Sequence, residues 1–277
     1  MKYLIVNGDD FGLTPLISKG IVNAYKEGIL TSTSLLATED GFENAVELSK
    51  ENPHLGIGIH LVLIEGRPVC HPKLISHLVD ENGMFRTNAL TYALKVFSHL
   101  VPVNEVESEW RAQIEKILNT GIKVTHMDSH KHLHVLPPLW EITAKLCEEY
   151  RIPAVRIPFQ KNGKLSLQYR IISSLASQSL MNARKRGIKS PDSFYGMDVS
   201  GTLDEDSIIK AIRSLPDGIS ELMAHPGYLD SDLVGKYSWT YQYNWDREQR
   251  ALCSMRVKHA LTENKVHLIN YKYFDHI

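Results

Sequence analysis

Short apolar runs alternate with longer amphipathic stretches along almost the whole chain, and this alternation restricts the fold more than any other feature. Short apolar runs are typical of buried strands, whereas apolar residues three and four positions apart are typical of helices that cover a sheet. We expect strands at residues 3–6, 31–37, 55–61, from 123 onward, 154–157, 218–224 and 267–271. We expect helices at residues 15–27, 41–50, 106–118, 138–150, 165–186, 205–215 and 246–263.

Alternating strand and helix units imply an α/β fold with a parallel sheet flanked by helices. No linker rich in Pro, Gly or Ser divides the sequence, so we predict a single domain over residues 1–277. No GxGxxG motif follows the first strand, which favours a distorted (β/α) barrel-like fold over an open doubly wound sheet. Residues 62–103 interrupt the rhythm, and we interpret them as a lid-like insertion.

The composition argues against several classes of partner. The chain has 31 Lys+Arg against 32 Asp+Glu, so it has little net field for gripping nucleic acid. Its three cysteines lie far apart without a CxxC pair, which is typical of a reducing compartment. No apolar run approaches the roughly 20 residues that cross a bilayer, and polar residues come too early for a signal peptide. We therefore expect a cytoplasmic protein that binds neither nucleic acid nor membrane.

Ionisable side chains gather where the predicted strands end. Asp9 and Asp10 follow the first strand, His60 ends the third, and Arg156 and His225 end two later ones. A histidine-rich segment, residues 125–134, ends the fourth. Because the carboxyl ends of parallel strands meet on one face of a barrel, and that face carries the active site, we expect these side chains to converge.

The adjacent carboxylates of Asp9 and Asp10 are the first indication of a metal. Two neighbouring carboxylates repel each other, so the pKa of one of them rises unless a cation intervenes. A divalent cation resolves the conflict if one carboxylate binds it and the other acts as a base. For either aspartate alone, a turn or a helix cap is the alternative.

Four of the 13 histidines fall within the segment 126–134. His126, Asp128, His130, His132 and His134 share parity, so a continuing strand would present them all on one side. Histidine with carboxylate is a ligand set for Zn, Mn, Fe or Co, and aspartate also accepts Mg. Asp128, with His126 beside it, is a candidate for the outer partner that fixes the tautomer of a ligand histidine. The alternative is a solvated histidine-rich loop. Because ligand geometry can use only one or two of the four histidines, we expect His134, the deepest in the loop, to tolerate replacement best.

Two further features leave alternatives open. His225 precedes Pro226-Gly227, a turn that would hold its ring at the mouth of a barrel, and Arg156 is either a site residue or part of a structural ion pair. Aromatic residues alternate along residues 237–245, which predicts an extended segment with its rings on one side. Such rings either pack in a core or an interface, or they form a stacking platform for sugars.

Taken together, four segments resemble the YdjC-like carbohydrate deacetylases, of which the chitooligosaccharide deacetylases are the best-known members. The segments are Asn7-Gly8-Asp9-Asp10-Phe11-Gly12, Gly58-Ile59-His60-Leu61, Thr125-His126-Met127-Asp128-Ser129-His130 and His225-Pro226-Gly227-Tyr228. Each motif alone is weak, but their order and spacing are specific. The resemblance covers nearly the whole chain, and Gly8 stands where the family often has alanine.

The resemblance implies a metal-dependent N-deacetylase with a barrel-like fold, distantly similar to the NodB-type polysaccharide deacetylases and often homodimeric. It implies that Asp10, His60 and His130 bind one divalent ion, Mg²⁺ by family resemblance, with Zn²⁺, Co²⁺ or Mn²⁺ as alternatives. It also implies that Asp9 is the general base and His225 the acid. The expected substrate is the N-acetyl group of a small amino sugar or chitooligosaccharide, as in chitin degradation.

Three functions remain open from the residues alone. In the first, an acetamide is hydrolysed: Asp9 removes a proton, His225 protonates the departing amine, and the metal or Arg156 stabilises the oxyanion. The second is a metal-dependent phosphoesterase that uses the same cluster, although the sequence shows no basic loop that grips phosphate. The third is a non-catalytic sugar-binding protein, which would leave the acid and histidine cluster unexplained.

Overall fold

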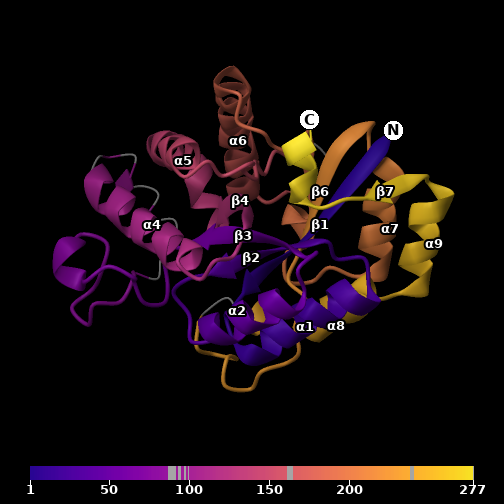
Figure 1. Cartoon of the computed structure of the whole chain (residues 1–277), viewed down its shortest axis with the longest axis horizontal. Helices are drawn as coiled ribbons and strands as arrows, with labels where there is room; N and C mark the ends of the chain where they lie inside the picture. The colour runs from indigo at the N-terminus through magenta and orange to yellow at the C-terminus, as the bar shows by residue number, and fades with distance from the viewer. Residues whose placement is uncertain are drawn as a thin grey trace.

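The computed structural model describes residues 1–86, 92, 95, 96, 98, 100–160, 165–237 and 240–276 (Figure 1). Within these residues, seven strands form one sheet in the order β4-β3-β2-β1-β6-β5, with β7 paired to β1. They are β1 (Lys2–Phe11), β2 (Ser32–Leu36), β3 (Gly56–Leu61), β4 (Val124–Ser129), β5 (Ser193–Tyr195), β6 (Gly218–Ala224) and β7 (Val266–Leu268).

All strand pairs are parallel, and β1 lies at the centre of the sheet. One edge of β1 pairs with β6, whereas the other pairs with β7 near Lys2 and with β2 beyond Asn7. Because every strand runs the same way, the carboxyl ends of β1, β3, β4 and β6 lie together at one end of the sheet.

The sheet is extended beyond β4 by irregular backbone. Val155 bridges Met127 of β4, and Ala154 bridges Lys189, which precedes β5. The strand predicted at residues 154–157 is thus reduced to single bridges, because Pro153 and Pro158 on either side have no N–H to donate. The barrel-like fold is confirmed, with this irregular closure in place of a regular strand.

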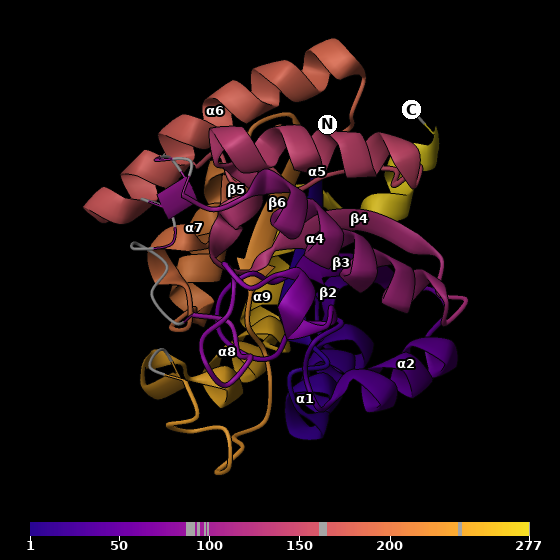
Figure 2. The same ribbon diagram turned by 90° about the vertical axis from the view of Figure 1, so that its left-hand side faces the viewer.

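Helices cover the outside of the sheet (Figure 1). They are α1 (Pro15–Glu27), α2 (Phe42–Glu51), α4 (Val103–Leu118), α5 (Pro137–Glu149), α6 (Leu167–Arg186), α7 (Glu205–Ser214), α8 (Trp245–Leu252) and α9 (Met255–Glu263). Figure 2 shows α4, α5 and α6 side by side across the β3–β4 edge. Among the described helices, none has both the length and the apolar character that a bilayer span requires.

Helix boundaries follow local capping chemistry. The first helix begins at Pro15, as predicted, because the Thr14 side chain accepts a hydrogen bond from the backbone N–H of Ile17. The single helix expected at residues 246–263 is wrong. The chain forms α8 and α9 there, because Ser254 leaves the helical conformation and its side chain caps α9 by accepting from the N–H of Arg256.

Candidate active site

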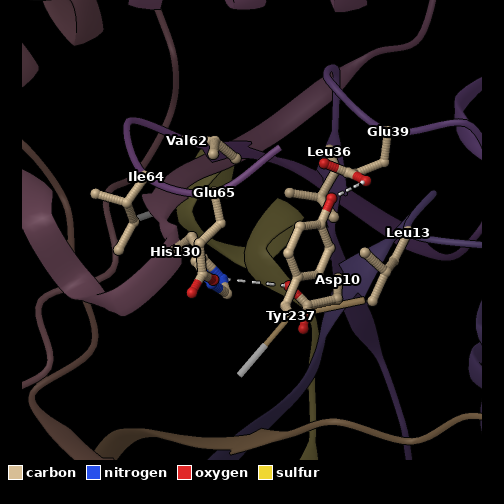
Figure 3. A pocket seen from close by; sticks show the side chains of 9 residues that line it. All are labelled: Asp10, Leu13, Leu36, Glu39, Val62, Ile64, Glu65, His130 and Tyr237. Carbon is tan, nitrogen blue, oxygen red and sulfur yellow. Dashed lines mark hydrogen bonds and ion pairs between the residues drawn. The ribbon is translucent and has the colours of Figure 1, made fainter. Parts of the chain in front are cut away.

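Three side chains meet where β1, β3 and β4 end. Oδ1 of Asp10 lies 3.5 Å from Nε2 of His60. The same oxygen lies 3.6 Å from Nδ1 of His130, the pair joined by a dashed line in Figure 3. One ligand atom from each of the three lies within 4.8 Å of the other two. The structure therefore brings together the three residues that the resemblance assigns to a metal.

Asp10 is held in an unusual backbone conformation. Its φ is 66°, in the left-handed region that costs a residue other than glycine roughly 1–3 kcal/mol. Both of its carboxylate oxygens are buried and make no hydrogen bond within the described part of the chain. Burial alone would raise the pKa of Asp10, but the neighbouring His130 and His60 rings hold it well below its usual range.

This geometry fits a divalent cation. A buried carboxylate without donors is costly unless a positive charge lies against it. One aspartate oxygen with two imidazole nitrogens is a donor set that Zn²⁺, Mn²⁺, Fe²⁺ and Co²⁺ accept, and the carboxylate also suits Mg²⁺. Asp10, His60 and His130 are the residues that would hold such an ion.

A hydrogen bond from the ring nitrogen that points away from Asp10 fixes the orientation of His60. Its Nδ1 lies 2.7 Å from Oδ1 of Asp128, whose Oδ2 accepts a 2.7 Å hydrogen bond from the Ser34 hydroxyl. Burial disfavours the charged ring, but Asp128 outweighs this effect and raises the pKa of His60. With Nδ1 donating to Asp128, Nε2 could present its lone pair to a cation bound beside Asp10, as a ligand histidine requires.

His126 lies one step further back in the same network. Its Nε2 is 3.2 Å from Oγ of Ser34, and its ring stacks on Tyr271 with centroids 3.8 Å apart. Burial lowers the pKa of His126 to about 3, so the ring is neutral. Both His126 and Asp128 contact Ser34, which agrees with the shared parity of the two residues in β4.

The parity argument is wrong beyond Asp128. The strand ends at Ser129, and His130–Val135 form a 3-10 turn in which Lys131 and His132 have φ of 55° and 57°. His134 is fully buried, with Nδ1 2.7 Å from Oγ of Ser129 and Nε2 2.7 Å from the carbonyl oxygen of Arg156. The expectation that His134 tolerates replacement best has therefore lost its premise, because the residue is part of the core.

Arg156 is enclosed by three carboxylates. It donates to both oxygens of Asp9, at 2.7 and 2.6 Å, and also contacts Asp128 and Glu221, each at 2.8 Å. Asn7 donates a further 2.9 Å hydrogen bond to Asp9. The guanidinium is fully buried and, in the described structure, lines neither of the two cavities at the site. The structure thus places the Arg156 guanidinium behind Asp9, and the expected contact of Arg156 with substrate stays a prediction.

Glu221 was missed in the sequence, although it carried a signal. It is a charged residue in the middle of the otherwise uncharged strand Gly218–Ala224, and a carboxylate buried in a strand needs a partner. Its second oxygen accepts a 2.5 Å hydrogen bond from the Tyr271 hydroxyl. Burial raises the pKa of Glu221 to about 7 despite the adjacent Arg156.

His225 lies just beyond β6 and lines a cavity together with Asp9, His60 and Lys131. Its backbone N–H donates a 2.5 Å hydrogen bond to Glu248, and its ring packs edge-on against Tyr243 with centroids 4.8 Å apart. Its Nδ1 is buried and has no hydrogen-bond partner in the described part of the chain. Burial lowers the pKa of His225 to about 4, so the ring is neutral at pH 7.

A second cavity also reaches the cluster (Figure 3). Asp10 and His130 form its floor, and Tyr237 donates a 3.0 Å hydrogen bond to Glu39 in its wall. The insertion at residues 62–103 supplies three further wall residues, Val62, Ile64 and Glu65. This contribution accords with the interpretation as a lid, which stays a prediction.

The extended aromatic segment predicted at residues 237–245 is wrong. The chain turns through Thr240–Gln242 and enters α8 at Trp245, so the rings diverge. Tyr237 and Tyr243 line the two different cavities, Tyr241 is exposed, and Trp245 is buried in the core. Trp239 lies outside the described residues. The alternating pattern did not predict the structure here because the turn at Thr240–Gln242 separates the aromatic positions.

The fold and the site together define a class: an α/β barrel-like protein with a buried carboxylate–imidazole cluster where its parallel strands end. The family model described as YdjC-like protein matches residues 3–263. The chain therefore belongs to the YdjC-like family, and the resemblance seen in its four segments is confirmed.

Three relatives illustrate the family. A carbohydrate deacetylase of Brevibacillus brevis is 35% identical over 276 residues, which covers 97% of this chain and 98% of the relative. A carbohydrate deacetylase of Clostridium beijerinckii is 36% identical over 273 residues, again covering 97% and 98%. A solved structure from Enterococcus faecalis V583, described as a proposed cellobiose-phosphate cleavage protein, is 28% identical with a TM-score of 0.78 and covers 98% of both chains.

Proposed function

We propose that this chain is a carbohydrate deacetylase, a hydrolase that removes an N-acetyl group from a small amino sugar or chitooligosaccharide with one divalent cation. The observation that carries the proposal is the buried Asp10 carboxylate between His60 and His130, with Asp9 at the neighbouring position. Neither oxygen of Asp10 has a hydrogen-bond partner among the described residues. The Brevibacillus brevis and Clostridium beijerinckii relatives, both named carbohydrate deacetylase, support the substrate class.

When bound, a divalent cation polarises the amide carbonyl and lowers the pKa of a coordinated water molecule. Asp9 accepts the proton of the attacking water, because its carboxylate lines the cavity next to His60 and His225. Arg156 and Asn7 hold that carboxylate in one orientation through their hydrogen bonds. In this scheme Arg156 acts through Asp9, and a cation held by Asp10, His60 and His130 would stabilise the developing oxyanion.

His225 protonates the departing amine. His225 lines the same cavity as Asp9, His60 and His130, and its backbone N–H is held by Glu248. His225 has to take up a proton before it can donate one, because burial lowers the pKa of its ring to about 4 in the free chain. In the proposed scheme it receives the proton that Asp9 accepts from the attacking water, and the nearby Asp9 and Asp10 carboxylates favour the protonated ring.

A metal-dependent phosphoesterase is the second candidate, because the Enterococcus faecalis relative is described as a proposed cellobiose-phosphate cleavage protein. The geometry favours it less, since the three carboxylates around Arg156 occupy the guanidinium that would otherwise grip a phosphate. A non-catalytic sugar-binding protein would not explain why the buried Asp10 carboxylate lies beside His60 and His130.

One experiment separates the three functions. The metal-loaded chain is incubated with diacetylchitobiose and, separately, with a generic phosphodiester, and acetate and phosphate are assayed. We expect acetate release that Asp10→Ala abolishes. Phosphate release alone would favour the phosphoesterase, and binding of the sugar without either product would favour the binding protein. The homodimer, the cytoplasmic location, the magnesium ion and the role in chitin degradation stay predictions.

A further inference from the structure

We infer that Glu65, from the insertion, orients the second ligand histidine, positioning His130 as Asp128 positions His60. The inference rests on the metal site of the proposed function. The two nitrogens of the His130 ring face two different carboxylates: Nδ1 lies 3.6 Å from Oδ1 of Asp10, and Nε2 lies 3.5 Å from Oε2 of Glu65. Figure 3 shows the Glu65 side chain beside the His130 ring.

The arrangement around His130 mirrors that around His60. His60 directs Nε2 toward Asp10 and Nδ1 toward Asp128, whereas His130 directs Nδ1 toward Asp10 and Nε2 toward Glu65. A neutral imidazole that offers a lone pair to a cation on one side carries its proton on the other nitrogen. For His130 that proton is on Nε2, and Glu65 is the acceptor that faces it.

The backbone around Glu65 is built to bury its carboxylate. Glu65 has φ of 63° and is followed by Gly66 with φ of 77°, so two consecutive left-handed residues turn the chain. The N–H of Glu65 donates to the carbonyl of Arg86, and the N–H of Phe85 donates to the carbonyl of Gly66. The preceding residues 62–64 are buried apolar side chains that anchor the turn to the core. Backbone strain of this kind, held in place by packing, is typical of functional positions.

The buried carboxylate of Glu65 can still accept a hydrogen bond. The residue is 7% exposed, and Oε2 has no hydrogen-bond partner among the described residues. A buried carboxylate oxygen without a donor destabilises the fold. Oε2 lies 3.5 Å from Nε2 of His130, so Glu65 is placed to accept the Nε2–H of a ring whose Nδ1 would bind a cation. Glu65 belongs to no described group of three ligand atoms within 4.8 Å, so the structure assigns it to the histidine and not to the ion.

The test measures Co²⁺ binding directly, by calorimetric titration and by the visible absorption of the bound ion. We expect Glu65→Ala to weaken Co²⁺ affinity roughly 10- to 100-fold and to alter the spectrum, as for other outer partners of metal ligands. Glu65→Gln, which keeps an acceptor oxygen, should retain part of the affinity. The matched control is Glu39→Gln, a carboxylate in the same cavity that contacts Tyr237 instead, and it should bind Co²⁺ like the unaltered chain.

Stability without metal separates positioning from a structural role. A structural residue lowers the free energy of unfolding when it is removed, whereas removal of the unsatisfied Glu65 carboxylate should leave the metal-free chain at least as stable. Unaltered Co²⁺ affinity and spectrum in Glu65→Ala would overturn the inference. Complete loss of Co²⁺ binding in both Glu65→Ala and Glu65→Gln, as expected for Asp10→Ala, would also overturn it, because Glu65 would then be a ligand itself. If the unaltered chain binds no divalent ion, the metal site of the proposed function fails first.

Discussion

Arg156 donates one hydrogen bond to each carboxylate oxygen of Asp9, at 2.7 and 2.6 Å, from a position with no exposure to solvent. The pair joins residues 147 positions apart in the chain. Because the guanidinium is planar and its donors are fixed, the two hydrogen bonds leave the Asp9 carboxylate a single orientation. The base of the proposed reaction is therefore held ready before substrate arrives.

Arg156→Lys keeps the buried positive charge but loses the planar, two-bond geometry. We expect the loss to appear mainly in kcat, by roughly 10-fold or more, with KM little changed, because Arg156 acts through Asp9. Steady-state kinetics with diacetylchitobiose make the measurement, and retained Co²⁺ binding shows that the site has folded. A rise in KM with an unchanged kcat would instead mean that Arg156 contacts the substrate.

Asp9→Asn keeps the shape of the side chain and removes the proton acceptor. If Asp9 is the base, turnover should fall roughly 10²–10⁴-fold while Asp10, His60 and His130 keep their ion. Turnover and metal content are measured on the same preparation. A variant that keeps both its metal and nearly its full deacetylation rate would remove Asp9 from the mechanism.

Asp10→Ala removes the shared carboxylate of the cluster. Since Asp10 faces both histidines, at 3.5 and 3.6 Å, we expect the variant to lose its divalent ion and its activity together. Elemental analysis after dialysis gives the stoichiometry. His126→Asn is the control, because His126 contacts Ser34 and Tyr271 rather than Asp10, and it should retain the ion. Full metal content in Asp10→Ala would refute the assignment.

Most of the elements, and the place where the site forms, could be predicted from the sequence. Hydrophobic period distinguishes strands from helices, and the parallel arrangement forces the residues after β1, β3 and β4 onto one face. These rules depend only on local spacing and on strand direction, and they predicted that Asp9, Asp10, His60 and the segment 125–134 converge. The choice of Asp10, His60 and His130 within that set came from the family resemblance.

The rest depended on contacts that local spacing does not encode. The partners of Arg156 come from three different strands, and no spacing rule could show that they would enclose it. The left-handed pair Lys131 and His132 ended the alternation without a glycine to mark it. Glu65 lies in an insertion without periodicity, where burial follows from the packing of the turn rather than from a pattern.

The last prediction concerns pH and His134, whose pKa burial lowers to about 4 from 6.5. The unfolded chain binds a proton at His134 near pH 6.5, whereas the folded chain does so only near pH 4. The stabilisation from the neutral ring is therefore complete above pH 6.5 and is lost as the pH falls toward 4. At pH 5 the free energy of unfolding has fallen by roughly 2 kcal/mol through His134, since one pKa unit corresponds to about 1.4 kcal/mol.

His134→Gln tests this sign. At pH 7.5 the variant should be less stable than the unaltered chain, because it loses the ring that joins Ser129 to the Arg156 carbonyl. At pH 5 the difference should narrow by roughly 2 kcal/mol, because the unaltered chain has then lost the contribution of its neutral ring. Urea unfolding at both pH values measures it, and His54→Gln, at an exposed position, controls for the removal of one histidine. A difference between His134→Gln and the unaltered chain that stays constant from pH 7.5 to pH 5 would show that His134 titrates alike in the folded and unfolded chains, contrary to its burial.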